Sequence, residues 1–186
     1  MITTDFNPFP NLETERLHLR ELTLNDAPDF FLMRSDLRVM KYIGRPIAKT
    51  VEDAEKIIQV MLDNKNLGDG INWGICMKNT SKVIGNIGYY RMKKEHDRAE
   101  VGYLLSADLF RKGIMHEALN AFLDYGFAKM NLHSVEAVIN PANEASEKLL
   151  LKNNFVREGY FKEEFFWNGV YQDSAVFSLL KKNRNI

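Results

Sequence analysis

The chain has 186 residues, of which 45% are hydrophobic and 27% are charged, and its 25 basic and 25 acidic residues give a formal net charge of zero. This composition predicts one globular domain with a substantial core. A zero net charge gives no global electrostatic reason to expect nucleic acid or an anionic membrane as a partner. The single cysteine, Cys76, excludes a disulfide within the chain and a cysteine-rich metal site, and its apolar surroundings predict a buried side chain.

The N-terminal residues lack the basic segment and the long apolar run of a secretory signal. No later stretch has the length and apolar character of a membrane span. We therefore expect a cytoplasmic protein in which residues 1–186 form a single domain. No internal repeat, low-complexity segment or domain linker interrupts the sequence, which agrees with this expectation.

The first predicted elements are a strand and two helices. Residues 16–20 alternate polar and apolar side chains, as a half-buried strand does. Asn25 and Asp26 are a good N-cap pair for one helix, and Thr50 opens the other, with Asp53 completing a variant capping box. The residues predicted to face inward from these two helices are Phe30, Phe31, Met33, Leu37, Ala54, Ile57, Ile58 and Met61.

The middle of the chain is a run of predicted strands. Residues 71–75 alternate in polarity, residues 83–90 are apolar with interspersed glycines, and residues 99–105 follow as a third strand. The charged stretch at residues 93–98 is predicted to be a solvated hairpin connection. These strands precede the strongest helical pattern of the chain.

Helices and strands alternate in the second half. Large apolar side chains at helical spacing over residues 115–130 predict a helix with one face in the core. A strand at residues 134–139 and a helix that opens at residues 141–143 come next. Two apolar-aromatic runs, at residues 161–167 and 171–180, flank an Asn-Gly turn that is typical of a β-hairpin. The order β, α, α, β, β, β, α, β, α, β, β predicts one mixed α/β domain.

Residues 110–117, Phe-Arg-Lys-Gly-Ile-Met-His-Glu, form a basic turn between a predicted strand and a predicted helix. Backbone N–H groups at a helix N-terminus are unpaired, and the helix dipole favours an anion there. Gly113 lets the backbone approach a ligand closely, and Arg111 and Lys112 add positive charge. The turn therefore suits a phosphate group, although basic turns of this kind are also common as plain solvated loops.

Further stretches accompany this turn in a specific order and spacing. They are TERLHLR at 14–20, VIGNIG at 83–88, AEVGY at 99–103, RKGIMHEA at 111–118 and NEAS at 143–146, followed by Leu149, Leu150, Lys152, Asn154, Phe155, Glu158, Gly159, Gly169 and Asp173. Together they resemble the GNAT superfamily of acetyl-CoA-dependent N-acetyltransferases, in particular the branch of bacterial enzymes that acetylate ribosomal-protein N-termini. The resemblance covers about residues 12–181. It implies a mixed, mostly antiparallel twisted sheet flanked by helices, with splayed central strands.

The resemblance also implies acetyl-CoA as cosubstrate. Its pantetheine arm would enter the gap between the splayed strands and pair with the strand backbone, where an N–H near Leu104 would polarise the thioester carbonyl. The turn at Gly113 would hold the pyrophosphate. The implied cofactor-binding residues are Tyr103, Leu104, Leu105, Phe110, Arg111, Lys112, Gly113, Ile114, Met115, His116, Asn143 and Ser146. No metal is expected, because the histidines show no ligand spacing.

Two residues are candidates for the chemistry. Glu100 lies on the strand beside the expected thioester and is a candidate for accepting the amine proton, directly or through water; a purely electrostatic role or a solvent-facing carboxylate remain alternatives. Ser146 occupies the position of the branch's serine, which would donate to the CoA sulfur. Its alternative is an ordinary first-turn serine bonded to the backbone. Leu150 stands where other GNAT enzymes have a tyrosine acid.

The chain departs from the family pattern at two positions. Met115 stands where the loop usually has Gly or Ala, and we expect its side chain to lie beside the pyrophosphate and alter the fit locally. Asn154 stands where Gly usually precedes Phe, which is a mild change because Asn tolerates left-handed backbone geometry. Asn143 has two compatible roles, as a helix N-cap and as a contact to the cofactor.

The resulting hypothesis is an N-acetyltransferase that moves acetyl from acetyl-CoA to a primary amine. The acceptor is a protein α-amino group or a small molecule such as a polyamine, amino-acid analogue or antibiotic, and the protein N-terminus is favoured.

A CoA-binding sensor without catalysis is a second hypothesis, supported by Met115. Dimers are frequent in the resembling branch, so a homodimer is an open alternative. The aromatic residues Tyr160, Phe165, Phe166 and Trp167 either line the acceptor cleft or pack the hairpin, and packing is favoured.

Overall fold

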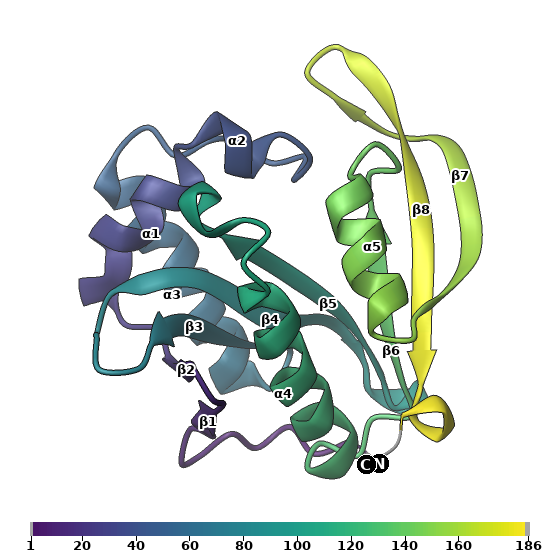
Figure 1. Cartoon of the computed structure of the whole chain (residues 1–186), viewed down its shortest axis with the longest axis horizontal. Helices are drawn as coiled ribbons and strands as arrows, with labels where there is room; N and C mark the ends of the chain where they lie inside the picture. The colour runs from purple at the N-terminus through teal and green to yellow at the C-terminus, as the bar shows by residue number, and fades with distance from the viewer. Residues whose placement is uncertain (1, 185–186) are drawn as a thin grey trace.

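A computed structural model describes residues 2–184. Its centre is an eight-stranded sheet with the strand order β1-β2-β3-β4-β5-β6-β8-β7, and helices cover both faces (Figure 1). All neighbouring strands are antiparallel except β5 and β6, which are parallel. This arrangement confirms the predicted mixed, mostly antiparallel sheet. Among the described residues, no helix combines the length and the apolar character that a membrane crossing requires.

The elements follow the predicted order, with one short strand and one short helix added. The strands are β1 (Leu12–Glu13), β2 (Leu17–Glu21), β3 (Ile71–Met77), β4 (Val83–Lys93), β5 (Arg98–Leu105), β6 (Ser134–Ile139), β7 (Val156–Trp167) and β8 (Val170–Leu180). The α-helices are α1 (Ala27–Arg34), α2 (Leu37–Met40), α3 (Val51–Leu67), α4 (Ile114–Ala128) and α5 (Glu144–Lys152). The additions are β1 and α2, which are too short to leave a periodic pattern in the sequence.

Local signals explain where several elements begin and end. Thr50 and Asp53 form the predicted capping box of α3, and Gly68 ends that helix in the left-handed conformation. Asn168 and Gly169 both have positive φ, as the predicted hairpin turn between β7 and β8 requires. These features need only a few neighbouring residues, which is why the sequence alone predicts them.

The first helix is shorter than predicted. It ends at Arg34, and Asp36 caps a separate helix by accepting a hydrogen bond from the Arg38 amide. Leu37 was expected to face the core but is 70% exposed. Asp26 occupies the N-cap position of α1 without capping it, because its carboxylate accepts hydrogen bonds from Arg20 and from the Thr23 amide instead. An ion pair with Arg20 and a capping box with Thr23 have thus replaced the predicted cap of α1.

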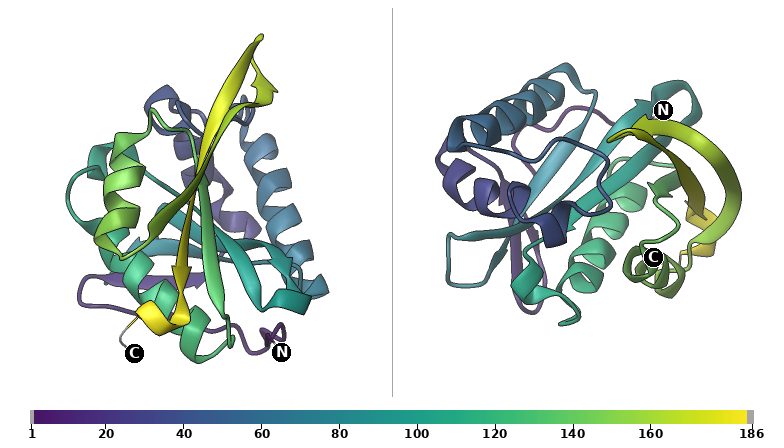
Figure 2. Two further views of the ribbon diagram at one scale, coloured as in Figure 1. Left: turned by 90° about the vertical axis from the view of Figure 1, so that its right-hand side faces the viewer. Right: turned by 90° about the horizontal axis from the view of Figure 1, so that it is seen from above.

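Two hydrophobic cores lie on opposite faces of the sheet. The larger one lies between the sheet and helices α4 and α5, where the buried Trp73 ring packs edge-on against Phe122 at a centroid distance of 5.6 Å. The smaller one lies beneath α1 and α3 and includes Cys76, which is buried as predicted. Figure 2 shows the two helical layers with the sheet between them. Strand β5 alternates between the cores: Tyr103 packs on the larger one and Leu104 on the smaller.

The central strands splay apart as the family resemblance implied. Strands β5 and β6 pair only at Arg98–Ser134, Ala99–Val135 and Glu100–Glu136. Beyond Glu100 the two strands diverge, and α5 lies beside β6 (Figure 1). One edge of β5 between residues 101 and 105 therefore has no neighbouring strand.

The glycine at position 88 gives a test of packing in the sheet. A Cβ atom there would lie 2.8 Å from the Ile71 carbonyl oxygen and would also overlap the buried side chain of Asn72. Gly88→Ala should lower the free energy of unfolding by about 1–3 kcal/mol, as overpacking does. Urea denaturation measures this change. Gly159→Ala is the control, because its nearest neighbour would be a ring atom of Phe161 at 3.3 Å, and equal stability losses for the two variants would contradict the packing described.

Candidate active site

The turn between β5 and α4 is exposed and has unusual backbone geometry. Arg111 and Gly113 both have positive φ, at 61° and 74°. The left-handed region suits glycine but strains arginine, and such strain is common where a backbone serves a ligand. Arg111, Lys112 and Gly113 are all exposed, so nothing in the described structure occludes the turn.

Helix α4 begins directly at this turn. Gly113 is its N-cap residue, and no side chain caps the helix. The first intrahelical bond runs from the Glu117 amide to the Gly113 carbonyl at 3.0 Å, so the helix itself does not use the amides of residues 113–116. These donors and the positive end of the 15-residue helix point out of the turn and suit an anion.

Glu117 anchors the turn to the connection between strands β1 and β2. Its carboxylate accepts hydrogen bonds from the Thr14 hydroxyl at 2.5 Å, the Arg16 amide at 2.8 Å and the Arg16 Nε at 2.6 Å. Arg16 Nη1 also donates to the Lys112 carbonyl at 3.1 Å. Partial burial opposes ionisation of Glu117, but these hydrogen bonds outweigh it and lower its pKa. Thr14, Arg16 and Glu117 therefore hold the start of α4 and the turn in one position.

The side chains of the turn do not all face the same way. Met115 is 8% exposed and packs in the larger core, so the expectation that it lies beside the pyrophosphate is wrong. The reason is the direction of the helix: the second residue of α4 faces the sheet. Ile114 is also buried, whereas Phe110 is 43% exposed. The Met115 side chain, which replaces the Gly or Ala usual in the family, thus lies in the core and does not cover the outer surface of the turn.

His116 is half-buried and held from two sides. Its Nδ1 lies 3.0 Å from Asn153 Nδ2 and 3.3 Å from Asn120 Nδ2. Burial lowers its pKa, and the charges of Lys152 and Arg184 lower it further. A neutral ring adds no positive charge to the turn, so any contact of His116 with a phosphate would be a hydrogen bond.

The free edge of β5 presents backbone groups to the gap between β5 and β6. The Ser106 amide donates to the Ile84 carbonyl at 2.8 Å. Because backbone groups alternate along a strand, the Leu104 amide also faces β4, and the amides of Tyr103 and Leu105 face the gap. Tyr103 and Leu105 are therefore the residues whose backbone is free to pair with an extended ligand, whereas the amide of Leu104, which was also expected to face the ligand, is directed at β4.

Glu100 lies where the two central strands begin to separate. Its side chain is 17% exposed and forms an ion pair with Arg91 at 2.8 Å. Burial raises its pKa above the ordinary value of 4.5, although the positive charge of Arg91 partly opposes the shift. Glu100 is thus neither a fully solvated surface carboxylate nor a deeply buried one.

Ser146 lies on the other side of the gap, in the first turn of α5. It is 7% exposed, and its Oγ is 2.6 Å from the phenol oxygen of Tyr103. The Ser146 amide donates to the side chain of Asn143 at 3.2 Å, which confirms Asn143 as an N-cap. Leu150 is fully buried one turn later, and Asn154 adopts the left-handed conformation, as its sequence context predicted. The Tyr103 side-chain contact is absent from the sequence prediction, because no spacing relates residues 103 and 146.

The hairpin of β7 and β8 bears out the packing expectation for its aromatic residues only in part: the Phe166 ring packs edge-on against Tyr171, with ring centroids 5.1 Å apart. Tyr160 is 44% exposed and Phe166 is 61% exposed, whereas Phe165 and Trp167 are half-buried. The edge position of β7 explains the exposure, since only β8 pairs with it. Phe165 approaches the segment between α2 and α3, where a Cβ on Gly44 would lie 3.0 Å from its ring.

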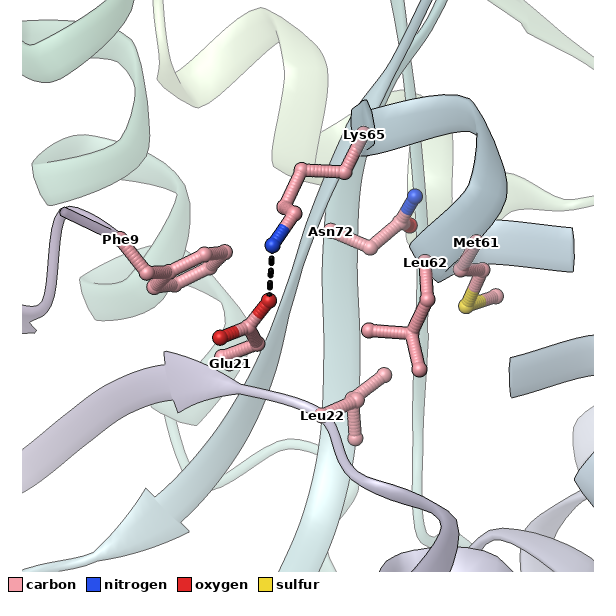
Figure 3. Close-up of a pocket in the computed structure, with 7 residues that line it drawn as sticks. All are labelled: Phe9, Glu21, Leu22, Met61, Leu62, Lys65 and Asn72. Atoms are coloured by element: carbon pink, nitrogen blue, oxygen red, sulfur yellow. Dashed lines mark hydrogen bonds and ion pairs between the residues drawn. The ribbon is translucent and has the colours of Figure 1, made fainter. Parts of the chain in front are cut away.

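Two hollows of the described structure lie away from this gap. The smaller one, about 10 Å³, lies between α3 and β2 beside the ion pair of Lys65 and Glu21 (Figure 3). It has about the volume that one water molecule needs. The larger one, about 550 Å³, lies at the sheet edge near His18 and Lys78. No group of three or more His, Cys, Asp or Glu side chains able to hold a metal ion occurs within residues 2–184.

Comparisons with known proteins agree with this arrangement. The family model for the acetyltransferase (GNAT) domain matches residues 16–156. The uncharacterized N-acetyltransferase YoaA of Bacillus subtilis is 36% identical over 173 residues, which cover 93% of this chain and 98% of that protein. The crystal structure of the ribosomal-protein-S5-alanine acetyltransferase from Vibrio fischeri superimposes with a TM-score of 0.80 at 25% identity, covering 95% of this chain and 100% of that chain. The spermidine N(1)-acetyltransferase of Vibrio cholerae is 26% identical over 167 residues, or 89% of this chain and 94% of that protein.

The contacts of Glu117 give a test of the turn. Glu117→Gln would turn an amide N–H₂ toward donors on Thr14 or Arg16 and so release the turn. The KM for acetyl-CoA should rise about tenfold, a loss of about 1.4 kcal/mol in binding, with kcat changed less than about twofold. Steady-state kinetics with varied acetyl-CoA measures both constants. Glu13→Gln is the control, because Glu13 pairs with His18 on β2, and an unchanged KM in the Glu117 variant would show that the clamp does not shape the turn.

Proposed function

The chain belongs to the GNAT family of acetyltransferases, and we propose that it transfers the acetyl group of acetyl-CoA to the α-amino group of a peptide or protein N-terminus. N-acetyl transfer is the activity that the family membership assigns. The observation that supports a working donor site in this chain is the gap between β5 and β6, which begins beyond Glu100 and leads toward the open turn at Gly113.

In this proposal the donor lies along the free edge of β5. The amides of residues 111–116 hold the pyrophosphate, and Arg111 and Lys112 add charge to the site. The pantetheine arm pairs with the backbone of Tyr103 and Leu105, like an added strand. The thioester then lies between Glu100 on β5 and Ser146 on α5.

The transfer needs an aligned amine and two proton movements. Backbone amides of β5 polarise the thioester carbonyl and stabilise the oxyanion that forms on attack. Glu100 takes the proton that the amine loses, directly or through water, and Ser146 donates to the sulfur of CoA. A raised pKa suits Glu100 to this role, because it makes the carboxylate a stronger base.

The charges around the gap favour an acceptor with a single positive group. Glu100 is already paired with Arg91, and Glu136 is paired with Arg98 at 2.6 Å. Arg34 on α1 is 8% exposed, and its guanidinium donates a hydrogen bond to the Pro46 carbonyl at 3.1 Å. A polyamine carries several cations and would need free carboxylates at these places. The ribosomal-protein acetyltransferase with the similar structure acts on an alanine of protein S5, as its name states.

A polyamine acceptor is the second candidate, because one relative at 26% identity is a spermidine acetyltransferase. The sensor hypothesis loses its sequence support, since Met115 is buried in the core and leaves the turn open. The two acetylation hypotheses therefore differ only in the acceptor.

The role of Glu100 predicts a specific dependence of rate on pH. The carboxylate must be ionised to accept a proton, so kcat/KM should fall as the pH drops through its raised pKa, which lies above 4.5. Glu100→Gln should remove this acidic limb and lower kcat/KM about 10- to 100-fold at neutral pH. Glu95→Gln, in the exposed hairpin connection, is the control. A variant with the wild-type pH profile would show that water or another group takes the proton.

A panel of amines tests the acceptor. Thiol release from acetyl-CoA should be fast with peptides that carry a free N-terminus and at least about tenfold slower with spermidine and other polyamines. A peptide with a blocked N-terminus and an internal lysine is the control for side-chain acetylation. Turnover on polyamines alone would overturn the peptide assignment. Binding of acetyl-CoA in a calorimeter without turnover on any amine would overturn catalysis itself.

A further inference from the structure

A pair of hydroxyl groups bridges the gap between β5 and α5. The phenol oxygen of Tyr103 lies 2.6 Å from Ser146 Oγ, and either atom can donate the hydrogen bond. Tyr103 lies in the part of β5 that has no partner on the β6 side, and Ser146 lies on α5, the helix beside β6. The contact therefore joins the two walls between which the proposed thioester lies.

The pair lies largely out of solvent. The Ser146 amide is occupied by Asn143, and Ser146 itself is 93% buried, since 7% of its surface is exposed. Burial raises the pKa of Tyr103 to about 12, although the hydrogen bond with Ser146 partly opposes the rise. The phenol thus stays protonated at physiological pH and is able to donate.

The proposed reaction requires a proton donor at the CoA sulfur. The C–S bond of the tetrahedral intermediate breaks as the new amide forms, and the departing thiolate needs a proton or a donor. A serine hydroxyl is a weaker acid than a phenol, so Ser146 alone is a poor source of that proton. Leu150, which occupies the position where other GNAT enzymes have a tyrosine acid, is apolar and fully buried. Tyr103 is the phenol that this chain holds beside Ser146.

We propose that Tyr103 and Ser146 form a two-hydroxyl relay that protonates the departing thiolate of CoA. The inference rests on the proposed acetyl transfer. Ser146 gives its proton to the CoA sulfur as the C–S bond breaks, and the Tyr103 phenol gives its proton to Ser146 Oγ. Water then returns a proton to the phenolate, while the proton lost by the amine leaves through Glu100. Tyr103 is a positioning residue in this scheme, because it acts through Ser146.

Tyr103→Phe tests the relay while keeping the ring in the core. The variant should lose about 10- to 100-fold in kcat, with the KM for acetyl-CoA and the calorimetric affinity for CoA changed less than about twofold. Ser146→Ala should show a similar loss. Because the two hydroxyls act as one unit, the double variant should be no more than about threefold slower than the slower single variant.

The control is Tyr125→Phe, which removes a phenol from α4 where its ring packs against Trp73. Its kcat should stay within about twofold of the wild type. Thermal unfolding of all variants shows that the fold is kept. The assay uses any amine that the wild-type protein acetylates, so a wrong acceptor assignment does not affect it.

Three outcomes would overturn the relay. They are unchanged values of both kcat and KM in Tyr103→Phe, a raised KM with kcat unchanged, and losses that multiply in the double variant. The first shows that the phenol is idle, the second gives it a role in cofactor binding, and the third shows that the two hydroxyls act independently. None of these results would disprove acetyl transfer, which the wild-type rate in the same assay establishes or excludes.

Discussion

Strands β5 and β6 stop pairing after Glu100, and this break in an otherwise continuous sheet determines what the molecule can do. A strand edge inside a fold normally finds a hydrogen-bonding neighbour, because unpaired backbone groups are costly when they lose water. Here the edge at Tyr103 and Leu105 has no neighbouring strand, and in the proposed function the pantetheine arm takes that place. The two cores on either face of the sheet hold β5 in place without that neighbour, since Tyr103 packs on one and Leu104 on the other.

The turn at the end of β5 depends on contacts from the start of the chain. Arg111 has a strained positive φ, and such a conformation persists only where the surroundings fix it. Thr14 and Arg16 supply that support through Glu117, and Arg16 also holds the Lys112 carbonyl. The connection between β1 and β2 therefore holds the turn in a conformation that the residues of the turn would not keep alone.

The sequence predicted most of the fold but less of the site, for a physical reason. Caps, hairpin turns and long periodic helices depend on neighbouring residues, so Thr50 and the helix from Ile114 were predictable. Leu37 was placed wrongly because the helix breaks before it: Asp36 caps a new helix there, and the sequence does not show which of several possible caps forms. Met115 was placed wrongly because the direction of a side chain depends on where its helix packs. The links of Glu117 to the first strands span about a hundred residues, and no local pattern reports them.

The alternation of one strand places the proposed proton-handling groups on opposite faces of the sheet. Glu100 and Tyr103 are three residues apart, so their side chains point to opposite sides of β5. In the proposed reaction, an amine that approaches from the α1 side meets Glu100, while the sulfur leaves toward Ser146 on the α5 side. The raised pKa of Glu100 lowers the stability of the folded protein at higher pH. The folded state binds the Glu100 proton more tightly than the unfolded state does, and this contribution to stability is lost as the pH rises from 4.5 through the raised pKa. Above that range the folded protein carries an ionised carboxylate that its surroundings disfavour. A general base benefits from such an environment because it binds a proton more readily, whereas a purely structural carboxylate gains nothing from it.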